Sequence, residues 1–188
     1  KFYNSSIDAF RNELKKDPTI QAVSASLTIP GKQREYKLVL KKYGVANSDS
    51  VTVRINTLDY EFLNVFKMKL IAGRAFSADF PKDVDTSIII TETAARLLGF
   101  RKPEDAVGKT CAIPQFNWNP IVVGVVNDYN QVSLKKPLDP SIFGCSLYDG
   151  EYYSLRINTN DLSRTLKHVQ HSWATAFPGN PFEFFFLD

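Results

Sequence analysis

Helix-like and strand-like segments follow one another along this chain in an irregular order, and that order restricts the possible folds more than any other feature. Helical spacing of apolar residues predicts helices over 5–16, from 59 onwards, over 91–99 and over 161–177. Apolar runs with strand-like patterns predict strands over 20–30, 35–42, 50–58, 86–91, 120–129, 142–149, 151–158 and 181–188. Asp149-Gly150 favours a hairpin between 142–149 and 151–158. A doubly wound sheet requires regular alternation of strands and helices, so this order predicts an α+β fold instead.

Two of the predicted helices carry clear start and stop signals. Thr91 is suited to cap the start of the first, and Gly99 ends it. Asp161 begins the second, which ends at 177–179, where Pro and Gly follow Phe. The residues expected to face the core are Ala94, Ala95, Leu97 and Leu98 in the first helix, and Leu162, Leu166, Val169, Trp173 and Ala176 in the second.

The stretch LIAGRAFS, Leu70–Ser77, follows a predicted helix for which Asp59 is the expected N-cap. Glycine beside arginine can cradle an anion, or it can let the chain turn where a side chain would clash. The apolar stripe of the helix has ended before Gly73, so no helix N-terminus points at this residue. We therefore interpret Gly73 as a turn residue. We expect Arg74 to hydrogen bond with an acidic side chain and Phe76 to pack underneath.

Composition and charge narrow the classes of partner. The 188 residues are 44% hydrophobic, which is enough for the core of one domain or of two small ones. The 23 Lys and Arg residues nearly balance 20 Asp and Glu residues and are interleaved with them, so nucleic acid is not an expected partner. No apolar run approaches the roughly 18 residues that span a bilayer. The sequence does not begin with Met and has no signal-peptide layout, so we expect a segment of a longer protein.

Two short motifs resemble catalytic signatures but lack essential parts. VGKT, at 107–110, lacks the first glycine of a phosphate-binding loop, because Pro103 occupies that position, and no helix is predicted to follow. We interpret Gly108 as a turn residue. GCSLY around Ser146 has Tyr148 where a nucleophile elbow requires its second glycine. Neither ATP binding nor hydrolysis is therefore expected here.

The remaining candidate groups favour structural roles. His168 and His171 have helical spacing, but they lie opposite the apolar stripe, so we interpret them as part of a solvated face and not as metal ligands. Asp128 follows a strand and is interpreted as a turn residue. Cys111 and Cys145 are too few for a disulfide framework, and whether they pair is left open. No catalytic residue, metal or cofactor is expected.

Several motifs in fixed order suggest a known family. VSASLTIP, DYEFLNVFKMKLIAGRAF, SIIITETAARLLGF, VGKT and IVVGVVNDY follow one another at characteristic spacings. Together they resemble the MacB-like periplasmic core domain of FtsX-type ABC transporter permeases. The most specific part is L-x-A-G-R-x-F followed by I-I-T-E-T-A-A-R-L-L-G, and the resemblance covers nearly the whole chain.

The resemblance implies an extracytoplasmic domain that lies between two membrane spans of a permease. It implies two lobes: a porter-like lobe from 1–58 and 134–188, and an inserted Sabre-like lobe from 59–133. It also implies a cytoplasmic ABC ATPase, reached through the membrane spans, and a second permease subunit as partners, while the involvement of a periplasmic adaptor or other protein is left open. Members of the family transmit ATP-driven motion, so no catalytic residue is carried over. The alternative is an extracytoplasmic ligand-binding sensor domain.

Overall fold

The computed structural model describes residues 2–32, 36–45, 50–128, 139–147 and 150–187, and the chain forms two compact units. Unit 1 combines Lys1–Val23 with Ser154–Asp188, and unit 2 comprises Ser24–Tyr153. The chain passes between the units twice, within β1 (Ile20–Ser26) and within β9 (Tyr152–Ile157). These bounds differ from those of the porter-like and Sabre-like lobes that the resemblance implies, and the lobe assignment stays a prediction.

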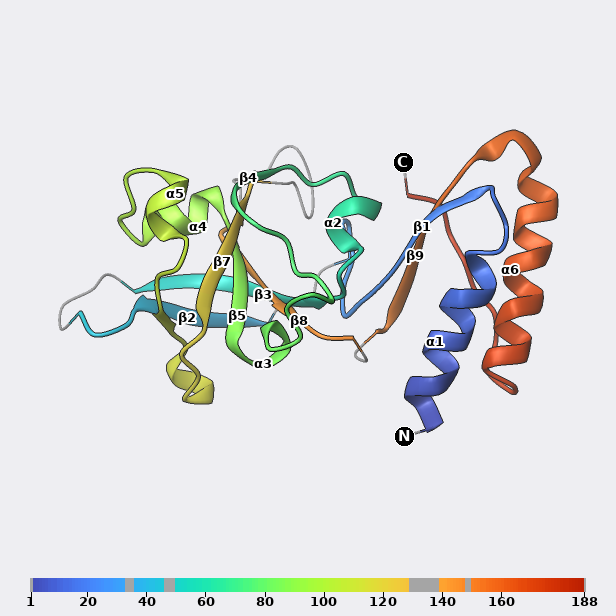
Figure 1. Ribbon diagram of the computed structural model, residues 1–188, viewed down its shortest axis with the longest axis horizontal. Helices are drawn as coiled ribbons and strands as arrows, with labels where there is room; N and C mark the ends of the chain where they lie inside the picture. The colour runs from blue at the N-terminus through green and yellow to red at the C-terminus, as the bar shows by residue number, and fades with distance from the viewer. Residues whose placement is uncertain (1, 33–35, 46–49, 129–138, 148–149, 188) are drawn as a thin grey trace. The chain divides into compact units, whose positions relative to one another are not determined.

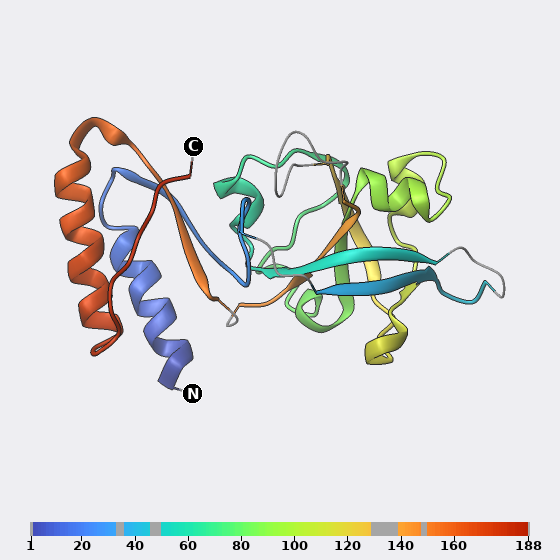
Figure 2. The same ribbon diagram turned by 180° about the vertical axis from the view of Figure 1, so that it is seen from behind.

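Unit 1 is built around two helices, α1 (Phe2–Leu14) and α6 (Leu162–Ala176). They are neighbours in space although they lie at opposite ends of the sequence. They run side by side in both ribbon views (Figure 1, Figure 2). The buried residues of α1 are Ile7, Phe10 and Leu14, which recur at helical spacing. The ring of Phe10 contacts the rings of Trp173 and Phe177 edge-on, with centroids 5.6 and 5.4 Å away. Aromatic packing therefore joins the two helices.

The sequence predictions for unit 1 are partly wrong. α6 has the predicted bounds, and Asp161 caps it by accepting a hydrogen bond from the Arg164 N–H. Its most buried residues, however, are Thr165, Val169 and Ser172, so the buried face is rotated from the predicted stripe. Residues 181–187 form no strand in the structure, and Phe184–Leu187 are exposed. A strand requires hydrogen bonds to a neighbour, which alternation of side chains alone does not provide.

Unit 2 contains a mixed sheet in the strand order β4-β7-β5-β8-β3. β3 pairs parallel with β8, and β5 pairs parallel with β7, while the other neighbours in this order are antiparallel. β2 pairs with both β3 and β6. The strands are β2 (Lys37–Lys42), β3 (Val51–Leu58), β4 (Leu70–Gly73), β5 (Ser87–Thr91), β6 (Cys111–Ala112), β7 (Ile121–Val126) and β8 (Ser141–Cys145).

Short helices accompany this sheet, and both of its faces are buried. The helices are α2 (Phe62–Val65), α3 (Asp83–Thr86), α4 (Glu92–Leu97) and α5 (Pro103–Ala106), with single 3₁₀ turns at Pro114–Phe116 in unit 2 and Thr159–Asp161 in unit 1. Ile88 and Ile90 of β5 lie in the core beside Ala94 of α4, whereas Ile89 lies in a second core beside Phe62 of α2. Because side chains alternate along a strand, burial of both faces explains the continuous apolar run of β5.

The mixed α+β fold agrees with the prediction from the order of elements. The predicted hairpin between β8 and β9 is wrong, because β8 pairs with β3 and β5, whereas β9 pairs with β1. Asp149, which suggested that hairpin, lies outside the described residues. Leu97 was expected in the core but is 44% exposed. Leu98, which was also expected in the core, is buried just before the chain turns at Gly99 with a φ of 77°.

Candidate functional site

The Gly73 motif lies at the end of a strand and not beyond a long helix. The predicted helix from Asp59 is limited to α2, because Lys67 adopts a left-handed conformation with a φ of 51° and turns the chain. β4 then pairs with β7, placing Gly73 opposite Gly124. A Cβ atom on Gly73 would lie 2.3 Å from the Val123 carbonyl oxygen, so only glycine permits this approach. The Gly73 φ of 71° imposes the same restriction.

Arg74 fastens the loop that follows to the first turn of α3. Its two terminal nitrogens donate to the two carboxylate oxygens of Asp83, at 2.5 and 2.9 Å. The guanidinium also lies over the ring of Phe80, 3.7 Å from the ring centroid. Phe76 is buried in the core that contains Phe62. Since both terminal nitrogens and one face are engaged, the guanidinium is committed to contacts within unit 2.

Asp83 is an ionised carboxylate at a buried position, with 3% of the residue exposed. Burial alone would raise the pKa of Asp83, but hydrogen bonds from Arg74 and Ser87, together with the charge of Arg74, outweigh burial and lower this pKa. The Ser87 hydroxyl donates to Asp83 over 2.8 Å. The hydrogen bond to Asp83 in turn raises the pKa of Arg74. The pair therefore stays charged around neutral pH.

Asp59 is not the N-cap of α2, and that sequence prediction is wrong. The residue is 3% exposed, and its carboxylate accepts hydrogen bonds from the Ser24 hydroxyl at 2.7 Å and from the Ala25 N–H at 2.8 Å. It also accepts from the Glu61 N–H at 3.1 Å, so it shapes the approach to α2. Glu61 occupies the N-cap position. The stretch around Ser24 lies 35 residues earlier in the chain, and no local pattern marks such a partner.

Gly108 lies in a turn between α5 and β6, where it has a φ of 78°. Its N–H donates to the Val122 carbonyl over 2.8 Å, and the Val122 N–H donates back to the Lys109 carbonyl over 2.9 Å. The backbone groups of this turn are thus used to attach it to β7. This geometry is that of a structural turn, as the sequence predicted for Gly108.

Asp128 and the two histidines have structural contacts. Asp128 accepts hydrogen bonds from the N–H and the hydroxyl of Thr93, at 3.0 and 2.6 Å, and so fixes the first turn of α4. His171 is exposed, but His168 is half-buried, with Nε2 3.2 Å from the Glu13 carbonyl oxygen. The interpretation of His168 as part of a solvated face is therefore wrong, because α1 packs against that side of α6. Among the described residues, no group of three His, Cys, Asp or Glu side chains could hold a metal ion.

Cys111 and Cys145 are buried free thiols. Burial raises the pKa of Cys111 to about 11 and outweighs the opposing effect of the Lys42 charge. Burial also raises the pKa of Cys145 to about 12, and the negative charges of Asp83 and Asp59 add to this shift. Both thiols are therefore protonated at neutral pH, and a protonated thiol is a poor nucleophile.

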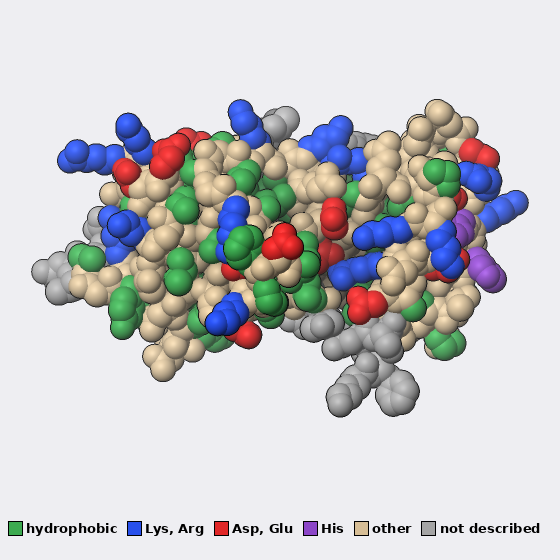
Figure 3. All heavy atoms as spheres, in the orientation of Figure 1, with side chains coloured by type: hydrophobic (Ala, Val, Ile, Leu, Met, Phe, Trp, Pro, Cys, Tyr) green, Lys and Arg blue, Asp and Glu red, His purple; other side chains and the backbone are tan. Residues whose placement is uncertain are grey.

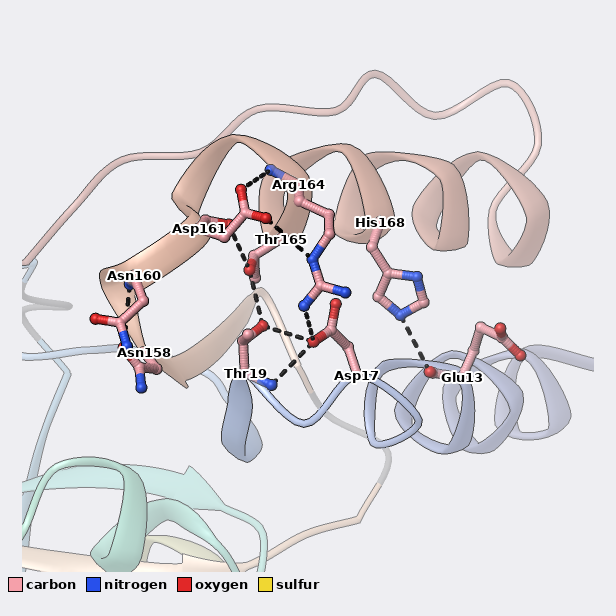
Figure 4. Close-up of polar contacts among 9 residues, drawn as sticks. All are labelled: Glu13, Asp17, Thr19, Asn158, Asn160, Asp161, Arg164, Thr165 and His168. Carbon is pink, nitrogen blue, oxygen red and sulfur yellow. Dashed lines mark hydrogen bonds and ion pairs between the residues drawn. The ribbon is translucent and has the colours of Figure 1, made fainter.

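A polar seam joins α1 to α6 in unit 1 (Figure 4). Asp17, just beyond α1, accepts hydrogen bonds from the N–H and the hydroxyl of Thr19, at 2.9 and 2.7 Å, and from Arg164 at 3.3 Å. The Thr19 hydroxyl is 2.7 Å from that of Thr165. The hydrogen bonds from Thr19 are the main cause of a lowered pKa at Asp17. Together with the His168 contact, this seam fixes the end of α1 against the start of α6.

The surface carries both signs of charge. On the face drawn in Figure 3, Lys and Arg side chains are interspersed with Asp and Glu side chains over the described residues. This distribution matches the near balance of charges in the sequence. In the described part of the chain, no helix is both long enough and apolar enough to cross a bilayer.

The fold has counterparts among extracytoplasmic domains of ABC transporters. The periplasmic region of MacB from Actinobacillus actinomycetemcomitans is 15% identical, with a TM-score of 0.62 over 90% of this chain and 73% of the other. The extracellular domain of the ABC-type transporter YknZ from Gram-positive bacteria is 18% identical, with a TM-score of 0.58 over 88% of this chain and 81% of the other. At these identities the likeness concerns the fold.

The sequence itself identifies the family. The profile of the MacB-like periplasmic core domain matches residues 3–160, so the chain belongs to that family. Comparison with curated protein sequences gives no match. The family consists of extracytoplasmic domains of ABC transporter permeases and not of typical enzymes. The resemblance drawn from the motifs, and the expected location outside the cytoplasmic membrane, are confirmed.

Proposed function

We propose that this domain transmits ATP-driven motion and contacts substrate or partner proteins outside the cytoplasmic membrane. An ABC transporter permease works in general with an ATPase and a second permease subunit, and the family assignment supports both as partners. The motion would be generated by the cytoplasmic ATPase and delivered through membrane spans attached to this domain. A periplasmic adaptor is a further partner that this function would accommodate.

One observation in unit 1 carries the proposal. α1 and the segment 181–187 lie at opposite ends of the sequence but belong to the same compact unit. Trp173 of α6 links them, since its ring contacts Phe10 of α1 at 5.6 Å and Phe182 at 6.3 Å between centroids. The polar seam around Asp17 reinforces the link between α1 and α6. A displacement applied to either segment is therefore delivered to one packed body.

The test interrupts the mechanical connection between this domain and the membrane spans without removing a contact inside the domain. In the full-length permease with its ATPase, a flexible Gly and Ser linker is inserted just before Phe2 or just after Asp188. We expect each insertion to abolish the transport or signalling output while ATP hydrolysis continues. ATPase rate and output are measured in parallel on the same preparation, and circular dichroism of the isolated variant domain verifies that it stays folded.

The matched control is the same linker inserted after Gly44, at an exposed position of unit 2. This insertion adds equal length and flexibility but leaves both ends of the domain unchanged, so output should persist. Full output with linkers at both ends would refute force transmission. It would favour a passive binding module, such as the ligand-binding sensor considered from the sequence.

A further inference from the structure

The chain enters unit 2 at Ser24 and leaves it after Tyr153, and the entering segment is held by a buried carboxylate. Asp59 follows directly on β3 and accepts hydrogen bonds from Ser24 and from the backbone of Ala25. The backbone adds a return contact, since the Asp59 N–H donates to the Ala25 carbonyl over 3.2 Å. The first two residues of unit 2 are thus attached to the end of β3 through both side chain and main chain.

A second buried polar side chain holds the continuation of the same segment. The Asn56 amide accepts a hydrogen bond from the Thr28 N–H at 3.1 Å and donates one to the Thr28 carbonyl at 3.0 Å. This pair of bonds imitates the pairing between two strands. The Leu27 N–H also donates to the Thr57 carbonyl over 3.0 Å. Residues 24–28 are therefore fixed along the last residues of β3.

The leaving segment is attached at the same place. The Glu151 N–H donates to the Ser26 carbonyl over 3.0 Å. Gly150 lies so close to the entering segment that a Cβ atom on it would be 3.0 Å from the Cβ atom of Ala25. Since the entering segment is itself attached to Asp59, this carboxylate contributes directly to holding the entering segment and indirectly to holding the leaving one.

A buried carboxylate is a strong anchor for such a segment. Hydrogen bonds to a charged group contribute more to stability than bonds between neutral groups, and the loss of the acceptor would leave the buried Ala25 N–H and the Ser24 hydroxyl without it. Asp59 supplies this acceptor and, unlike the backbone contacts, its side chain can be removed by a substitution. Its removal should therefore release the entering segment locally.

We infer that Asp59 is a positioning residue for force transmission. It holds the entering segment, and through it the leaving segment, to the end of β3, so that unit 2 moves together with both segments. This inference rests on the proposed function, and it adds the residue through which unit 2 receives the motion.

Hydrogen exchange of the 188-residue chain tests whether Asp59 holds residues 24–28, without any transport assay. In Asp59→Asn the shape is retained, but the amide has one acceptor oxygen where the carboxylate has two, so either the Ala25 N–H or the Ser24 hydroxyl and the Glu61 N–H lose their acceptor. We expect peptides covering 24–28 to exchange about tenfold faster or more, while peptides from β5 and β7 keep their wild-type rates. Unchanged exchange at 24–28, or an equal acceleration throughout unit 2, would overturn the inference.

The matched control is Asp83→Asn. Asp83 is the same residue type, also 3% exposed and also bonded through both carboxylate oxygens, but it anchors the loop after Arg74. It should accelerate exchange over 74–87 and leave 24–28 unchanged. If Asp59→Asn does not fold, Ser24→Ala removes a single bond to the same carboxylate and should still accelerate exchange at 24–28. No acceleration in that variant would overturn the inference.

The functional arm uses the full-length permease with its ATPase. Asp59→Asn should reduce output severalfold with the ATPase rate unchanged, whereas Asp83→Asn should retain output. Full output in Asp59→Asn, with exchange locally accelerated and the linker variants inactive, would refute the role of Asp59 alone. Full output in the linker variants would instead refute force transmission itself, so the two failures are distinguishable.

Discussion

Replacing Gly73 by alanine tests whether the close approach of β4 to β7 restricts this position. Two separate penalties apply. The φ of 71° is unfavourable for any residue with a Cβ atom. The new Cβ atom would also lie 2.3 Å from the Val123 carbonyl oxygen and 3.0 Å from the Cα atom of Gly124, and both of these are backbone atoms that cannot rotate away.

The magnitude follows from adding the two penalties. A left-handed conformation costs a residue with a Cβ atom about 1–2 kcal/mol. Relief of the clash requires a shift of the β7 backbone, and forced overpacking of this kind costs typically about 1–3 kcal/mol. We therefore expect Gly73→Ala to lower the free energy of unfolding by about 2–5 kcal/mol, a large share of the stability of an ordinary domain. Gly73→Val should cost more, because a β-branched side chain resists positive φ more strongly.

Urea unfolding followed by circular dichroism measures this loss, with Gly108→Ala as the control. Gly108 has a similar φ of 78°, but among the described residues no heavy atom lies within 4 Å of the position of its Cβ atom. Alanine there should cost only the conformational penalty of about 1–2 kcal/mol. The difference between the two variants isolates the clash with Val123. An equal loss of stability in both variants would refute the reasoning.

Three further predictions concern the buried ionisable groups and the expectation that no metal or nucleotide is bound. Because the pKa of folded Asp83 is lowered, the stabilising contribution of this carboxylate is present above about pH 4 and is lost as the pH falls below that value. The urea midpoints of wild type and Asp83→Asn should therefore differ at pH 7 and approach each other toward pH 3. A difference that does not change with pH would contradict this. Cys111 and Cys145, with their raised pKa values and burial, should react slowly with a thiol reagent at pH 8 and rapidly in urea, so fast labelling of the folded chain would be the opposing result. Addition of a chelator or of ATP should leave the melting temperature unchanged, and a shift of several degrees would reveal a bound metal or nucleotide.

The sequence predicted elements whose signals are local. β5 and α4 are adjacent in the chain, and Thr91 caps α4 by accepting from the Ala94 N–H, as its position before the apolar residues indicated. Gly99 ends the same helix region with positive φ. The capping bond and the glycine conformation each depend on residues within one or two turns. Patterns of that length are visible in a single sequence.

The failures concern partners that are distant in the sequence. Asp59 has the position and chemistry of a helix cap, but its buried carboxylate accepts hydrogen bonds from Ser24 and Ala25 instead of capping α2. β8 pairs with β3, which lies far earlier in the sequence. The turn signal between β8 and β9 therefore does not decide which strand pairs with β8. His168 faces α1 for the same reason. Which distant segment lies opposite a side chain is fixed by the whole core and not by local spacing.

The backbone hydrogen bond between Ser26 and Glu151 has a consequence for the order of folding. During synthesis α1 is made before residues 24–153 and α6 after them, so α1 cannot pack against α6 until these residues have been made. The entropic cost of bringing distant segments together rises with the length of unstructured chain between them. Once unit 2 has folded, Ser26 and Glu151 are adjacent, and α1 and α6 are separated by little more than the two segments that lead away from them. Folding of unit 2 therefore lowers the entropic cost of packing α1 against α6.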